Sequence, residues 1–230
     1  IKTLLILFSL FFVGNAFGQI TYTWTGATST AWNNTANWSK SPSGGTSTPG
    51  TVATDIVIIP TTATNQPTLS TALGTNIASL TFTSTTAATL TITGQTLNVT
   101  GAVTLNSIAG GNTACTITGT GTLSCASVAV GLTSVAPTGS RTSTMTSSIS
   151  TFTISGTLAL NGTTDNGSGI RIVAPTFTQS GGTVSVDNIT TTYTSLGTSG
   201  DAITCTYTMS GTTPTLNFTG ATPFTLSATP

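Results

Sequence analysis

Residues 89–101 read Thr-Leu-Thr-Ile-Thr-Gly-Gln-Thr-Leu-Asn-Val-Thr-Gly, and this stretch holds two copies of the phrase on which the chain is built. The phrase is Thr, an apolar residue, Thr or Asn, a second apolar residue, Ser or Thr, and then Gly. Clear further copies are Thr151–Gly156, Thr206–Gly211 and Thr215–Gly220. Looser copies occupy 114–119 and 176–181. The repetition indicates one structural unit used several times.

The alternation within the phrase predicts β-strands. Successive side chains of an extended chain point to opposite faces, so the apolar residues share one face and Thr, Ser and Asn share the other. Threonine favours extended backbone because it is β-branched, and the closing glycine permits a tight bend. Strands this short cannot bury their apolar face alone, so successive units must stack. We predict an all-β repeat fold, a β-solenoid like a parallel β-helix, with β-sandwiches as the alternative.

The composition argues against an enzyme. Only 3% of the 230 residues are charged, and histidine is absent. The acidic residues are four aspartates, Asp55, Asp165, Asp187 and Asp201, with no glutamate. General acid–base catalysis needs a positioned titratable group, and a serine or threonine hydroxyl without a neighbouring base is a weak nucleophile. We therefore predict no catalytic site and no cofactor.

The same inventory limits the partners. The four cations, Lys2, Lys40, Arg141 and Arg171, are scattered, whereas nucleic-acid binding needs a basic patch that neutralises several phosphates. The three cysteines lack a CxxC spacing and have no histidine beside them, so no zinc pattern is present. The sequence predicts neither nucleic-acid binding nor a metal site.

The first residues predict export. Lys2 precedes an apolar run at 4–13, and small residues lead up to Gly18. This arrangement is typical of a secretory signal peptide, and the apolar run is shorter than the roughly 20 residues that span a bilayer. We predict cleavage after Gly18, a secreted product and no membrane insertion after signal removal. The expected organisation is a signal at 1–18, a tryptophan-containing cap region at 19–77 and a repeat region at 78–230 that continues beyond Pro230.

Export places the cysteines in an oxidising compartment. Cys115 and Cys125 flank Gly119-Thr120-Gly121, which would form the turn of a hairpin and place the two thiols opposite each other. A disulfide closing so short a loop would stabilise the fold by about 2–3 kcal/mol. The alternative is that both are small buried apolar residues. Cys205 has no evident partner and is expected to be buried.

The three tryptophans, Trp24, Trp32 and Trp38, all lie before the repeats. If exposed, they could stack on sugar rings and form a glycan-binding site. If buried, they would cover the first end of the stack, because a repeat array needs a cap where it begins. Burial is the usual state of tryptophan and favours the cap.

Thr-x-Thr pairs suggest a further alternative, ice binding. Ranks of outward threonines on a rigid solenoid can present hydroxyls and methyls as a regular lattice. The candidate residues are Thr81, Thr83, Thr89, Thr91, Thr116, Thr118, Thr151, Thr153, Thr206 and Thr208. Their uneven spacing along the sequence leads us to expect no single flat array.

Several stretches resemble a known group of proteins. The segment 4–19 ends in Asn-Ala-Phe-Gly-Gln, and the opening continues with Thr23-Trp24-Thr25-Gly26, Trp32-Asn33 and Asn37-Trp38. Asp-Ile-Val-Ile-Ile-Pro at 55–60 and Asn-Gln-Pro at 65–67 follow. Together they resemble the start of large flavobacterial (Bacteroidetes) secreted surface proteins, in which a Trp-rich opening leads into Thr/Gly-rich β-solenoid repeats. The resemblance implies type IX secretion and a role as an adhesin or structural fibre.

The expected function is therefore that of a secreted, non-catalytic structural or adhesin-like β-solenoid at the cell surface. Its expected partners are cell-surface or matrix glycans, or other copies of itself, since a nearly uncharged surface offers little repulsion between copies. Such association would produce homo-oligomers or fibres. An ice-binding or glycan-binding module is the alternative.

Overall fold

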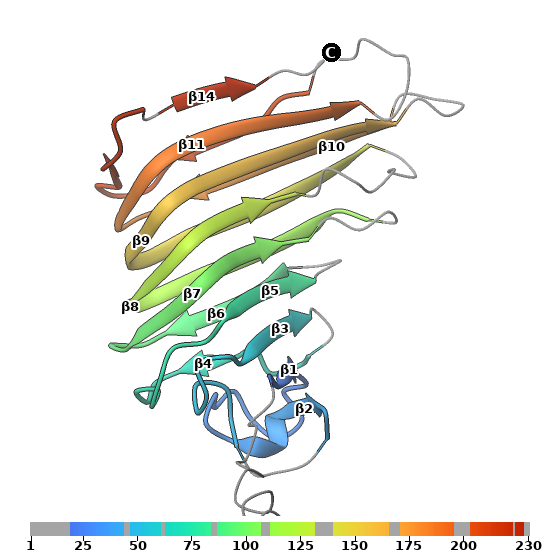
Figure 1. The fold of residues 1–230 in the computed structure, drawn as a ribbon, viewed down its shortest axis with the longest axis vertical. Helices are drawn as coiled ribbons and strands as arrows, with labels where there is room; N and C mark the ends of the chain where they lie inside the picture. Colours follow the sequence, from blue (N-terminus) through green and yellow to red (C-terminus); the bar gives the residue numbers. More distant parts are fainter. Residues whose placement is uncertain are drawn as a thin grey trace, which may run out of the picture.

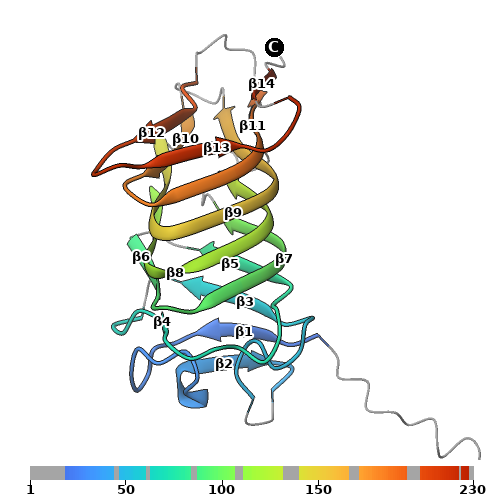
Figure 2. The ribbon, with the colours of Figure 1, turned by 90° about the vertical axis from the view of Figure 1, so that its left-hand side faces the viewer.

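A computed structural model describes most of the chain after the first 18 residues and confirms the predicted β-solenoid (Figure 1). The described residues are 19–43, 47–60, 63–83, 87–106, 111–131, 140–165, 171–195, 203–222 and 224–227. Within them the strands stack mostly in parallel along one axis, and the turned view shows them as successive rungs (Figure 2). The predicted signal peptide lies outside the described residues.

The elements are fourteen strands and one short 3₁₀ helix among the described residues. The first part contains β1 (Thr21–Trp24), η1 (Thr35–Asn37), β2 (Trp38–Ser41), β3 (Ile56–Pro60), β4 (Thr68–Leu69), β5 (Ser79–Thr83) and β6 (Ala87–Ile92). The middle contains the longer β7 (Thr96–Leu105), β8 (Thr113–Val130) and β9 (Arg141–Asp165). The last part contains β10 (Arg171–Gln179), β11 (Thr183–Ser195), β12 (Thr206–Met209), β13 (Thr215–Phe218) and β14 (Phe224–Ser227).

Strand pairing divides the solenoid into three faces. Face 1 comprises β1, β3, β5, β14 and the later parts of β7, β8, β9 and β11. Face 2 comprises β4, β6, β10, β12 and the first parts of β8 and β9. Face 3 comprises β13, the first parts of β7 and β11, and the middle of β8 and β9. The long strands thus bend from one face to the next, as Figure 1 shows at their left-hand ends.

The core is built from apolar columns that run along the axis, one side chain from each rung. On face 1 one column passes through Val57, Leu80, Val103, Val128 and Leu158, all with no exposed area. Each such side chain contributes about 1.5–3 kcal/mol when it leaves water. The parallel stack exists because every rung supplies the next with an apolar partner at the same position.

Glycines mark the corners where a strand changes face. Gly119 has φ +114°, and a Cβ there would overlap the carbonyl oxygen of Ile92 on the preceding rung. A positive φ is open to glycine and unfavourable for other residues. The corner between faces 2 and 3 therefore depends on the glycine that closes the repeated phrase.

This corner corrects the predicted hairpin and disulfide. Thr113–Val130 is one strand, β8, which bends at Gly119 instead of folding back. Cys115 consequently lies on face 2 and Cys125 on face 3, both buried as free thiols. The alternation around Gly119-Thr120-Gly121 suits a hairpin equally well, but pairing with the rungs on either side keeps the strand extended.

The parallel ladder begins earlier than the expected boundary after residue 77. β1 pairs in parallel with β3, and β3 with β5. β2 pairs antiparallel with β1 and closes that end of the sheet. The tryptophan-containing cap region is thus continuous with the repeats.

Candidate binding surfaces

The tryptophans form the buried core of the first end. Trp24 and Trp32 are each 1% exposed and Trp38 is 6% exposed. Trp38 makes edge-to-face contacts with both of the others, with ring centroids 4.8 and 4.9 Å apart. Each indole N–H donates to a backbone carbonyl, Trp24 to Asn65, Trp32 to Pro49 and Trp38 to Trp32. These rings occupy the place of a cap and leave no face for a sugar ring, so glycan stacking on them is excluded.

The polar residues of the Trp-rich opening serve the same cap. Asn37 is fully buried, and its Oδ1 accepts from the backbone N–H groups of Thr28 and Ser29 while its Nδ2 donates to Ala31. The Oδ2 of Asp55, also buried, accepts from the backbone N–H groups of Gly50 and Val52. Buried polar groups are tolerated when they are hydrogen-bonded. These side chains therefore hold loops in place.

The candidate threonines are distributed over all three faces. Thr81 and Thr83 lie on face 1, and Thr151 and Thr153 lie on face 3. The remaining six share face 2: Thr89, Thr91, Thr116, Thr118, Thr206 and Thr208. The ten residues thus do not share one surface, but most of them lie on face 2.

Face 2 carries a regular array, contrary to the expectation from the uneven spacing. Its central rank consists of residues paired directly from rung to rung: Thr89, Thr116, Thr146, Thr178 and Thr208. On one side lies the rank Thr68, Thr91, Thr118 and Ser148. On the other side lies the rank Ala87, Ala114, Thr144, Thr176 and Thr206. The sequence pattern alone did not single out Thr144, Thr146, Thr176 and Thr178.

The unequal coil lengths are absorbed elsewhere. The connections from face 1 to face 2 run from β7 to β8, from β8 to β9 and from β9 to β10, and they differ in length. Along face 2 the paired residues advance one for one in every row of the array. Strand β10 also pairs with β9 in antiparallel order where Arg171–Val173 meets Thr163–Asp165. From Val173 to Gln179, its residues pair in rising order with Arg141–Ser147. The lattice is therefore regular although the sequence spacing is not.

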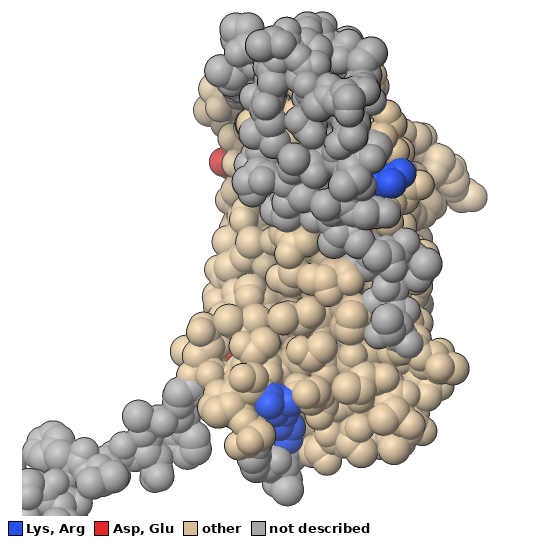
Figure 3. Space-filling view, turned by 90° about the vertical axis from the view of Figure 1, so that its right-hand side faces the viewer, with Lys and Arg blue, Asp and Glu red and all other residues tan. Residues whose placement is uncertain are grey.

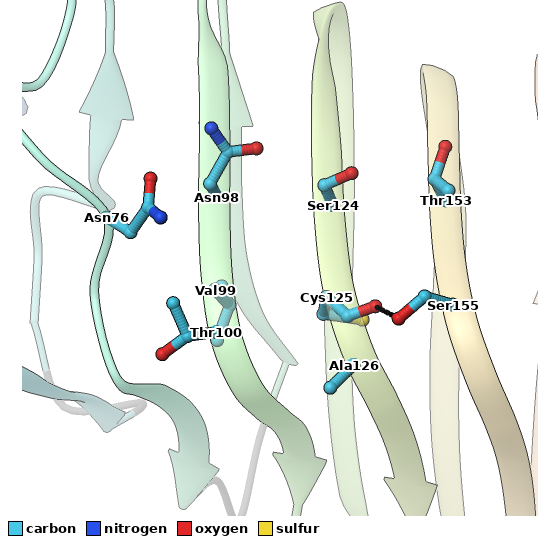
Figure 4. Close-up of a pocket in the computed structure, with 9 residues that line it drawn as sticks. All are labelled: Asn76, Asn98, Val99, Thr100, Ser124, Cys125, Ala126, Thr153 and Ser155. Carbon is cyan, nitrogen blue, oxygen red and sulfur yellow. Dashed lines mark hydrogen bonds between the residues drawn. The ribbon is translucent and has the colours of Figure 1, made fainter. Parts of the chain in front are cut away.

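A shallow groove of about 340 Å³ lies on face 3 where the strands turn towards face 1 (Figure 4). Asn98, Ser124 and Thr153 lie side by side along it on successive strands. Val99, Cys125 and Ala126 add apolar surface, and Ser155 donates to the carbonyl of Cys125 at 3.4 Å. The lining is uncharged, with amides and hydroxyls that can donate and accept hydrogen bonds.

Charge is sparse over the described surface. Figure 3 shows one side of the molecule, on which charged atoms form only small isolated areas. Among the described residues, no group of three or more His, Cys, Asp or Glu side chains could hold a metal ion. No described helix is long and apolar enough to cross a membrane. No protein-family model, curated protein or solved structure matches the chain.

Proposed function

We propose that the chain is an exported structural or adhesin-like β-solenoid that presents uncharged, hydroxyl-rich faces at the cell surface. The observation that carries the proposal is the parallel stack itself, whose outward residues on the paired strands are mostly Thr, Ser, Asn and Ala. A repeat stack makes a stiff, extended body with broad surfaces suited to weak contacts at many points. The proposed product acts by contact and performs no chemistry.

The two ends of the stack differ, and the difference favours growth or association at the end that holds β12 and β13. The first end is covered by β2 and the tryptophan cluster. At the other end Met209 and Phe218 are 44% and 43% exposed, although each continues a core column of the preceding rungs. A strand edge with apolar side chains is a template for further strands. Additional coils or another copy of the chain would bury these residues.

Neutral glycans are the partner class that suits the groove on face 3. Its amides and hydroxyls match the hydrogen-bonding capacity of sugar hydroxyls, and it has no charge to select ionic ligands. Asn98, Ser124 and Thr153 repeat along the solenoid axis, at about 4.8 Å per rung. A linear glycan could therefore lie across several rungs.

The proposal is tested by the adhesion of cells that display the chain on their surface. Residues 19–230 would be anchored on cells that do not adhere, and retention on surfaces coated with neutral polysaccharides would be measured under flow. We expect the displayed chain to raise retention, and Ser124→Trp, which fills the groove, to lower it to the level of cells without the chain. Thr104→Trp, on face 1, is the matched control and should keep the gain. Retention no higher than that of undecorated cells on every coating would contradict the adhesive role.

A further inference from the structure

The central outward rank of face 2 is more uniform than the inward column beside it. The inward column next to the central rank changes freely: Leu90, Ile117, Ser147, Gln179 and Met209. The outward central rank is threonine in all five rungs. The core sets the volume that inward residues fill, whereas strand formation alone accepts several residue types at outward positions. A rank of identical threonines therefore indicates that the outward surface is under a requirement of its own.

Face 1 provides the internal comparison. Its equivalent outward rank contains Thr23, Ile58, Thr81, Thr104, Ala129, Ala159 and Thr190. The same chain, with the same abundance of threonine, thus builds a mixed rank where only strand formation is needed. Composition and β-propensity therefore do not account for the constant rank on face 2.

The geometry of face 2 is that of a two-dimensional lattice. Neighbouring rungs of a sheet are about 4.8 Å apart, and alternate residues along a parallel strand are about 6.6 Å apart. The side chains of Thr116 and Thr146 are only partly exposed, because each is packed between its neighbours along the rank. Branching at Cβ restricts the χ1 rotamers of threonine. Along the central rank, methyls and hydroxyls therefore repeat from rung to rung with limited rotational freedom.

We propose that face 2 is an ice-binding surface, on which the threonine array holds water molecules in the arrangement of an ice crystal face. Ice presents a periodic lattice of water, and a rigid periodic array can match it at many points at once. Each hydroxyl contributes little alone, since a net hydrogen bond is worth about 0.5–1.5 kcal/mol, so binding depends on the repetition. Pre-organised side chains lose little entropy when the water above them becomes ordered.

The side-chain chemistry favours ice over a crystalline polysaccharide. Aromatic rings that could stack on sugars are absent from the outward positions of the three ranks, and so are charges. The array is instead made of threonine, serine and alanine. This inference does not depend on the adhesive role, because it concerns the purified chain and a different face from the groove.

The experiment measures the partition of purified residues 19–230 into a slowly growing ice crystal, together with the thermal hysteresis of the same solution. We expect the wild-type chain to be enriched in ice. Thr116→Tyr, in the central rank of face 2, lifts the surface away from the lattice and should lower the fraction in ice at least about tenfold, the effect of losing roughly 1.4 kcal/mol of binding. Thr146→Lys is a second variant in the same rank. Thr104→Tyr on face 1 is the matched control and should bind ice like the wild type.

Circular dichroism melts of all four proteins establish whether each is folded. If Thr116→Tyr does not fold, the comparison rests on Thr146→Lys. Exclusion of the wild-type chain from ice would overturn the proposal. An equal loss in Thr104→Tyr and in the face 2 variants would also overturn it, because the effect would not belong to the array. Adhesion of cells displaying Thr116→Tyr should be unchanged at room temperature, so failure here is distinguishable from failure of the adhesive role.

Discussion

At the scale of single residues, the tryptophans show how one residue type can be interpreted in two ways from sequence. Trp24, Trp32 and Trp38 suit a sugar platform as well as a cap, because the alternation around them does not say whether a further rung covers them. The structure buries all three and satisfies each indole N–H. Their contribution is therefore to stability.

Trp38→Ala should destabilise the chain by about 3–5 kcal/mol, because it removes the ring that contacts both other indoles and leaves a cavity. Urea unfolding followed by circular dichroism would measure the loss. Phe218→Ala, an aromatic truncation at a position 43% exposed, is the control and should cost under about 1 kcal/mol. Equal losses in the two variants would show that the tryptophan cluster is not a packed cap.

Cys125 makes stability depend on alkaline pH. Burial raises the pKa of its thiol from 9.0 to about 12, an effect partly offset by hydrogen bonds with the backbone of Val103 and Ser127. Above pH 9 the thiol ionises in the unfolded chain but not in the folded one, so the unfolded state gains. The free energy of unfolding should fall by about 1.4 kcal/mol per pH unit from this group between pH 9 and pH 12.

Cys125→Ala should remove that slope. We expect the variant to be less stable than the wild type at pH 8, because it leaves a small cavity, and to lose less stability between pH 9.5 and pH 11. Urea titrations at these pH values would give both slopes. Parallel pH profiles for the two proteins would mean that the thiol is not buried as a neutral group.

At the scale of elements, alternation predicts strands and core positions well, because the two-residue period assigns each side chain to one face. Thr89–Ile92 and Thr151–Ile154 are strand segments with inward apolar residues, as the pattern indicates. The register between strands cannot be predicted in this way. It is set between rungs by contacts about 30 residues apart, and the connecting segments vary in length. Neither the face 2 array nor the unbroken path of β8 could be obtained from the local pattern.

The register of face 2 can be tested by cross-linking. Thr116 and Thr146 pair directly, and residues on neighbouring strands lie within the 4.4–6.8 Å Cα separation that a disulfide accepts. The double variant Thr116→Cys, Thr146→Cys should form an intramolecular disulfide on oxidation. Thr116→Cys with Ser148→Cys is displaced by two residues and should not, since its Cα separation is about 8 Å.

Peptide mapping of the oxidised proteins would identify the bond. The native thiols of Cys115 and Cys125 are buried, so they should stay unreacted in the folded chain, and the partly exposed Cys205 is replaced by alanine in every variant. A disulfide in the displaced pair and none in the direct pair would contradict the register and the array that depends on it.

At the scale of the whole molecule, the fold has a direction. A cap with antiparallel pairing closes one end, and a rung with exposed apolar side chains ends the described stack at the other. Between them, three faces have different surfaces: a mixed face 1, a threonine array on face 2 and an uncharged groove on face 3. The proposed adhesive and ice-binding roles both depend on the rungs being stacked in register.

The most direct test of that stacking is the distance between spin labels placed along the central rank of face 2. Labels at Thr89→Cys and Thr178→Cys are three rungs apart, and labels at Thr89→Cys and Thr208→Cys are four rungs apart, with the native cysteines replaced by alanine. Double electron–electron resonance should give backbone-to-backbone separations of about 14 and 19 Å once the label length is allowed for. An increase of one strand spacing between the two pairs, with narrow distributions, is the predicted result. Separations that do not rise from the first pair to the second would contradict the solenoid and every role proposed for its faces.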